Sequence, residues 1–102
     1  MSFTINMHAR AMAELDAIHD SLSAYSETAA DRTYALIKDG ILGLSDFPRR
    51  YAIAPESERS SIEVRHLIIG NYRVLYSIIG ATVSVWRVVH GARRAIDPID
   101  LY

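Results

Sequence analysis

The 102-residue chain has no cysteine and only one lysine. Without cysteine there can be no disulfide scaffold, thiolate nucleophile or zinc–thiolate site, and nothing ties the protein to an oxidising compartment. Residues 1–10 lack the basic and apolar regions of a signal peptide, and no apolar run approaches the ~20 residues that cross a bilayer. We therefore expect a cytoplasmic protein with no membrane partner.

Acidic and basic residues are unevenly distributed, although the formal net charge is only −1. Residues 1–46 carry three Lys/Arg against seven Asp/Glu, whereas residues 47–102 carry eight against five. Half of the residues are apolar, which is typical of a folded globular protein, and the length suits a single domain over residues 1–102. The late arginines predict a surface that meets an anionic or acidic partner, or simply a solvated face.

The N-terminal half predicts a strand and two helices. Residues 3–7 alternate weakly and favour a short strand. Apolar residues then recur at spacings of three and four over residues 9–25, and again after Ser26, an N-cap residue, up to Leu44. These two stripes predict a helical hairpin, in which Gly40 and Gly43 could let another element approach closely.

The C-terminal half predicts a surface loop and an antiparallel sheet. Residues 48–61 mix two prolines with serine and charge, and they carry Arg49 and Arg50. Gly70-Asn71 and Gly80-Ala81 separate three β-branched and aromatic runs, as hairpin turns do. These runs are residues 62–69, 72–79 and 82–90. The order of elements predicts an α+β fold, with the first strand joining the meander and both helices covering one sheet face.

The other sheet face is predicted to be partly open to water. Alternate residues of a strand point to the same side of the sheet. Arg73, Leu75 and Ser77 therefore share one side of the strand over residues 72–79. Arg87 and Val85 share one side of the strand over residues 82–90. We expect the open face to carry Arg73 or Arg87. An alternative is that Arg73 pairs with a carboxylate of the first helix.

Most catalytic and cofactor motifs are absent from the sequence. There is no G-x-S-x-G, P-loop or dinucleotide fingerprint, and the four histidines lack metal-binding spacing. We therefore expect no cofactor and no metal. What remains is a cluster of cationic and aromatic residues near the end of the sheet: Arg65, Arg73, Arg87, His90, Arg93 and Arg94, with Tyr72, Tyr76 and Trp86. Histidine and arginine can cleave RNA without a metal, although the aromatic residues are equally consistent with a core.

These segments also resemble a known family. IEVRHLIIGNYRVLYSI over residues 62–78 and VSVWRVVHGARR over residues 83–94 resemble the RelE/ParE superfamily of bacterial type II toxin–antitoxin toxins. The resemblance implies a cognate antitoxin whose extended segment wraps the toxin. It also implies one of two targets, because RelE-like members cleave mRNA in the ribosome and ParE-like members inhibit DNA gyrase without being nucleases.

The resemblance assigns roles to particular residues. In RelE-like enzymes the arginine of the Y-R motif, here Arg73, stabilises phosphate, and the terminal basic group corresponds to His90 and Arg93. Apart from the resemblance, we expect Arg65, Arg87 and Arg94 of the cationic cluster to contact the target. RelE-like enzymes also use lysines on the strand before that hairpin, where this chain has none.

The sequence favours a ParE-like target slightly, because a protein that docks on ribosomal RNA is usually markedly basic and this chain has a pI of about 6.4. A RelE-like endoribonuclease and an inactive module that only binds antitoxin remain the alternatives.

Overall fold

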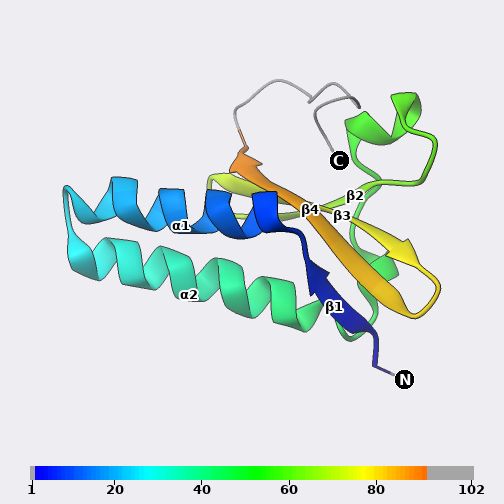
Figure 1. Cartoon of the computed structure of the whole chain (residues 1–102), viewed down its shortest axis with the longest axis horizontal. Helices are drawn as coiled ribbons and strands as arrows, with labels where there is room; N and C mark the ends of the chain where they lie inside the picture. Colours follow the sequence, from blue (N-terminus) through cyan, green and yellow to red (C-terminus); the bar gives the residue numbers. More distant parts are fainter. Residues whose placement is uncertain (1, 92–102) are drawn as a thin grey trace.

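The structure is a computed structural model, and it describes residues 2–91. The chain forms one sheet of four strands, with two helices on one side of it (Figure 1). Four strands and two helices make up the main elements: β1 (Thr4–Met7), α1 (Ala9–Ser23), α2 (Glu27–Gly43), β2 (Arg65–Ile69), β3 (Tyr72–Ile79) and β4 (Thr82–His90). The predicted α+β fold is confirmed.

The strand order is β1-β4-β3-β2. β2, β3 and β4 form the predicted antiparallel meander, and β1 joins it parallel to β4, from Thr4 beside Thr82 to Met7 beside Val85. Gly70 and Gly80 have φ of 55° and 60°, which the tight turns between these strands require and which glycine adopts without strain.

The helical hairpin is built as its sequence pattern predicts. The Ser26 hydroxyl accepts a hydrogen bond from the Ala29 N–H and so caps α2. Apolar residues of both helices pack on valines and Tyr76 of the sheet. A Cβ at Gly40 would overlap the Ile69 side chain, so the predicted close approach is confirmed at this glycine, whereas Gly43 has no such neighbour.

The segment between α2 and β2 covers the other sheet face. It contains two short 3-10 helices, η1 (Pro48–Arg50) and η2 (Pro55–Arg59), and Ile53 forms a bridge with Arg65 at the edge of β2. Ala54, Val64, Leu75, Val89 and the partly buried Trp86 make a second, smaller core beneath it. The expectation that this face is open is therefore wrong, because the loop packs on it.

A β-bulge in β4 corrects the predicted alternation of that strand. Leu75 pairs with Arg87, but Tyr76 pairs with Val85, so Trp86 has no partner on β3. As a result Val88, and not Arg87, follows Val83 and Val85 in the core under the helices. Within residues 2–91 we find no helix long and apolar enough to cross a membrane.

Candidate functional site

Arg73, the central arginine of the predicted site, is buried. It lies in β3 with only 7% of its surface exposed. Its two terminal nitrogens, Nη1 and Nη2, donate to Oε1 and Oε2 of Glu56, at 3.1 and 2.7 Å. The Glu56 side chain, from η2, is fully buried. This bidentate pair fixes the covering segment to the sheet, because either charge alone would be costly to bury.

His66 completes this buried cluster from β2. Its Nδ1 lies 3.1 Å from Arg73 Nη1, a donor, so the neutral ring accepts this hydrogen bond. Burial lowers the pKa of His66, the neighbouring Arg73 lowers it further, and Glu56 partly opposes both. This environment favours the neutral form of His66 over the protonated form.

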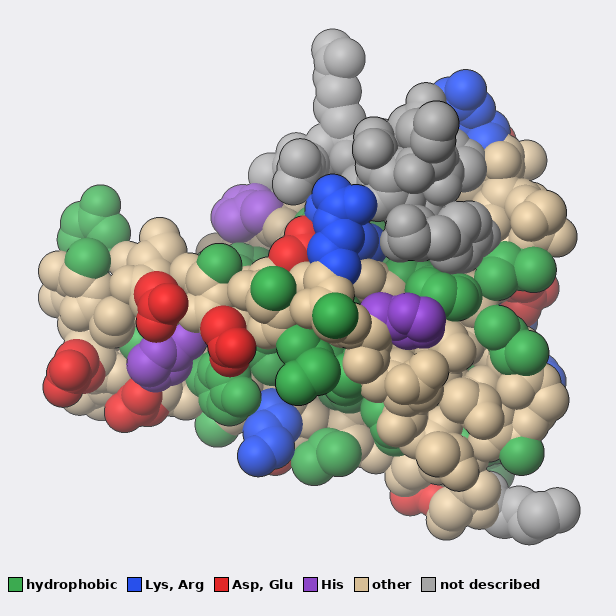
Figure 2. Space-filling view, viewed as in Figure 1, with side chains coloured by type: hydrophobic (Ala, Val, Ile, Leu, Met, Phe, Trp, Pro, Cys, Tyr) green, Lys and Arg blue, Asp and Glu red, His purple; other side chains and the backbone are tan. Residues whose placement is uncertain are grey.

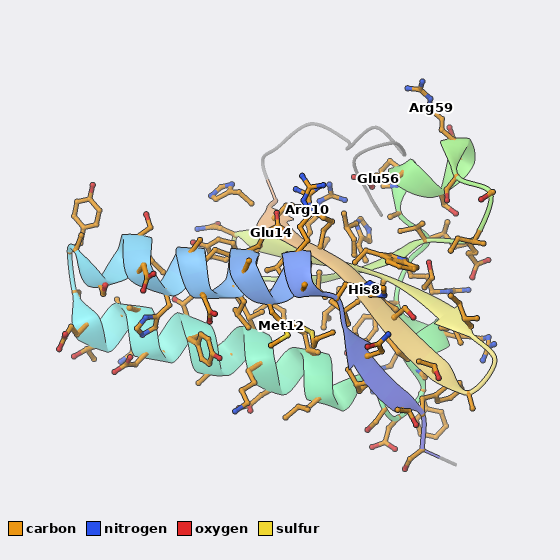
Figure 3. The ribbon with its side chains drawn as sticks, in the orientation of Figure 1. His8, Arg10, Met12, Glu14, Glu56 and Arg59 are labelled. Carbon is orange, nitrogen blue, oxygen red and sulfur yellow. The ribbon has the colours of Figure 1, made fainter. Side chains whose placement is uncertain are left out.

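Arg87 is also buried and paired, with 3% of its surface exposed. Its Nε and Nη2 each donate to a carboxylate oxygen of Glu14 in α1, both at 2.8 Å. Glu14 Oε1 also accepts from the Val88 N–H at 3.1 Å, beyond the point where β1 ends. Glu14 and Arg10 lie on the same side of α1 (Figure 3). A carboxylate of the first helix thus pairs with Arg87, whereas the partner of Arg73 comes from η2.

Arg65 is engaged by the covering segment rather than exposed to a target. Its Nε donates to Glu63, and its Nη1 donates to the backbone carbonyls of Arg49 and Tyr51, at 2.9 and 2.7 Å. Beside it, the buried Tyr76 hydroxyl donates to the carbonyl of Pro48 at 2.6 Å. Burial raises the pKa of Tyr76 to about 12, so this hydroxyl stays protonated.

His90 is the exposed member of the predicted site. It ends β4 opposite Tyr72, whose ring meets the imidazole edge-to-face at 5.5 Å between centroids. Both residues line an open groove of about 460 Å³ between α1 and this end of the sheet. Arg93, which was predicted to act with His90, and Arg94, which was predicted to contact the target, lie outside the described residues.

The described part of the site is thus a set of internal ion pairs more than an open anion-binding surface. Arg65, Arg73 and Arg87 sit on neighbouring strands, but each is bound to its own protein acceptor. Across residues 2–91 no group of three or more histidine or acidic side chains is placed to hold a metal ion.

Sequence reasoning missed Glu56 and Glu14, which decide the state of the two central arginines. One signal was available: Leu75 and Val89 share a sheet face with Arg73, and an open face would leave both exposed.

A family model described as the ParE toxin of the type II toxin–antitoxin system, parDE, matches residues 5–95. The chain belongs to the ParE toxin family. Among curated proteins it is similar to toxin RelE2 of Caulobacter vibrioides, with 29% identity over 84 residues that cover 82% of this chain and 90% of the relative.

Solved structures support the fold of this ParE-family toxin. A chain of the chromosomal ParDE system from P. aeruginosa superposes with a TM-score of 0.71 at 18% identity, covering 87% of this chain and 96% of that one. A chain of the RelBE2 toxin–antitoxin complex from Mycobacterium tuberculosis gives 0.65 at 23% identity, covering 88% and 99%. Because both branches of the superfamily share the architecture, the fold alone does not choose the target.

Proposed function

We propose that this ParE-family toxin arrests growth by binding DNA gyrase, that it does not cut RNA, and that a cognate antitoxin neutralises it. The burial and pairing of Arg73 carry this proposal. A phosphate-stabilising arginine must turn its N–H groups to the reacting oxygens, yet those of Arg73 are directed to Glu56 and His66. Releasing it would break a buried ion pair, at a cost of about 3–5 kcal/mol.

The charge distribution supports the same choice. Docking on RNA draws affinity from many phosphate contacts and therefore needs an extended basic surface. In Figure 2 acidic side chains gather along the helical hairpin, while basic ones are scattered over this face. A net charge of −1 and two buried, neutralised arginines suit a protein target better than a ribosomal one.

A cognate antitoxin is the second part of the proposal. The similar structures from P. aeruginosa and M. tuberculosis belong to a ParDE system and a RelBE2 toxin–antitoxin complex. A short reading frame beside the toxin gene should encode a protein that co-purifies with this chain and restores growth.

A RelE-like endoribonuclease is the alternative, and the exposed His90 favours it. His90 stands beside Tyr72 at an open groove and precedes Arg93 in sequence, so it could donate or accept a proton there. In that mechanism Arg73 would stabilise the phosphate once Glu56 moved away. The similarity to toxin RelE2 also supports this alternative.

Two assays run side by side test the proposal. Purified toxin should block supercoiling of relaxed plasmid by gyrase, and primer extension on cellular mRNA after induction should show no new ends. New mRNA ends that disappear in a His90→Ala variant, together with normal supercoiling, would establish the alternative. Supercoiling and mRNA that are both normal, with no growth arrest, would instead indicate a module that only binds antitoxin.

A further inference from the structure

The segment that follows α2 presents an aromatic ring and two arginines on a fixed backbone. Phe47 precedes η1, and Arg49 and Arg50 lie within it. All three are exposed, in contrast to Arg73 and Arg87. The end of α2, the start of β1 and this segment converge near the N-terminus (Figure 1). We call Phe47, Arg49 and Arg50 the η1 patch.

The backbone under the η1 patch is held from below by buried or half-buried side chains. The carbonyl of Pro48 accepts from Tyr76, and the carbonyls of Arg49 and Tyr51 accept from Arg65. The residue before β1 also contributes, because the Phe3 N–H donates to the Ser45 carbonyl at 2.8 Å. Side-chain donors from two neighbouring strands thus fix three carbonyls within four residues.

Phe47 is held in a conformation that its own chemistry disfavours. Its φ and ψ are 52° and 54°, the left-handed region that residues with a Cβ rarely adopt, and 76% of its surface is exposed. An apolar ring gains nothing for folding by standing in water. Strain that persists at an exposed position is typical of functional sites.

The two arginines are oriented by neighbouring rings. The Arg50 guanidinium lies 5.0 Å from the centre of the Tyr51 ring, and that of Arg49 lies 5.9 Å from the centre of the Phe3 ring. No ion pair within residues 2–91 involves Arg49 or Arg50. Both charges are therefore available to a partner, and part of their side-chain freedom has already been lost.

We propose that the η1 patch is the surface by which this toxin docks on its protein target, with Phe47 entering an apolar pocket and the arginines meeting carboxylates around it. This inference rests on the proposed function, in which the target is a protein. Exposed aromatic and arginine side chains on a rigid backbone are typical of the residues that dominate protein interfaces. Two arginines beside the exposed Asp46 are too few to follow a phosphate backbone, which disfavours a nucleic acid at this patch.

Substitutions that keep the fold can test the patch. Phe47→Gly and Phe47→Asn remove the ring and suit a left-handed backbone, so the urea midpoint of unfolding should not fall. Arg49→Glu with Arg50→Glu reverses both charges. Tyr25→Ser removes a ring that is 90% exposed at the far end of the hairpin. Arg59→Glu reverses an arginine that points away from the molecule (Figure 3), so these two variants are matched controls.

Three readouts are needed for each variant: growth arrest on induction, inhibition of purified gyrase, and co-purification with the antitoxin. The patch variants should lose growth arrest, and half-inhibition of gyrase should need at least about 30-fold more toxin. They should still bind antitoxin, and both control variants should behave as wild type. If wild type arrests growth without inhibiting gyrase and the patch variants lose arrest, the choice of gyrase fails while the docking surface stands.

Three outcomes would overturn the inference. One is undiminished growth arrest in the patch variants. Another is loss of antitoxin binding with arrest retained, which would assign the patch to the antitoxin. The third is salt-sensitive binding of wild type to a 20-nucleotide RNA that the double charge reversal abolishes, which would assign the patch to nucleic acid.

Discussion

Replacing Arg73 by alanine should destabilise the toxin by about 3–5 kcal/mol, because it leaves the fully buried carboxylate of Glu56 without its partner. The same change removes a hydrogen bond to His66. A loss of this size is a large part of the about 5–15 kcal/mol that stabilises an ordinary domain. It would free the η2 segment from the sheet.

Urea unfolding of the free toxin, refolded after removal of antitoxin, measures this loss. Glu56→Leu alone should lower the free energy of unfolding by less than Arg73→Ala does. The Arg73 side chain is longer than that of Glu56, so it can move its charge toward water when its partner is removed. The double variant Arg73→Met with Glu56→Leu should lie within about 1–2 kcal/mol of wild type, since buried pairs are often replaced by apolar residues at little cost. The double variant keeps the test decisive even if Arg73→Ala fails to fold.

An Arg73→Ala protein within about 0.5 kcal/mol of wild type would refute this reasoning, because such a value is typical of an exposed residue. It would mean that Arg73 and Glu56 are not a buried pair in solution. The arginine would then be available to a phosphate, and the main support for a non-nuclease toxin would be lost.

Three further predictions concern the side chains that join the elements. Glu14→Ala should lower the free energy of unfolding by about 2–3 kcal/mol, because it leaves the buried Arg87 without its partner carboxylate. Urea unfolding measures this loss. Asp16→Ala on the same helix is the control, and it should change the free energy of unfolding little. Tyr76→Phe should cost about 1–2 kcal/mol in the same assay, since the buried Pro48 carbonyl loses its donor. The pKa of His66 in the folded protein is below its usual 6.5. The stability that His66 contributes is therefore present above pH 6.5 and is lost as the pH falls through the lower folded pKa. His66→Gln should flatten this part of the curve of stability against pH.

The elements could be predicted because their signals are local. Apolar spacing set α1 and α2, Ser26 capped the second helix, and the Gly70 and Gly80 turns separated the strands. Each signal lies within a few residues of the structure that it predicts, so no knowledge of the chain path was needed.

The state of the arginines could not be predicted in the same way. Arg73 and its partner Glu56 are 17 residues apart, and Arg87 and Glu14 are 73 apart, so both pairs depend on how whole elements dock. The bulge at Trp86 also changes which residues of β4 share a face, and nothing in a strict period of two anticipates it. Arg73 and Arg87, which were predicted to form part of a basic surface, thus lie in two internal ion pairs.

Two of the exposed cations come from a segment that was predicted to be a surface loop. Arg49 and Arg50 lie there, and the loop prediction was correct in placing them at the surface. The anchoring of its backbone was not foreseen, because the hydrogen bonds come from Tyr76 and Arg65 of the sheet beneath it.

The central claim is that the toxin inhibits gyrase and does not cut RNA. Its most direct test measures supercoiling of relaxed plasmid by gyrase in the presence of a toxin variant that lacks the groups proposed for RNA cleavage. The triple variant Arg73→Met, Glu56→Leu, His90→Ala should fold, and it should block supercoiling as strongly as wild type. Normal supercoiling in the presence of wild-type toxin would contradict the claim. So would a folded triple variant that has lost the block.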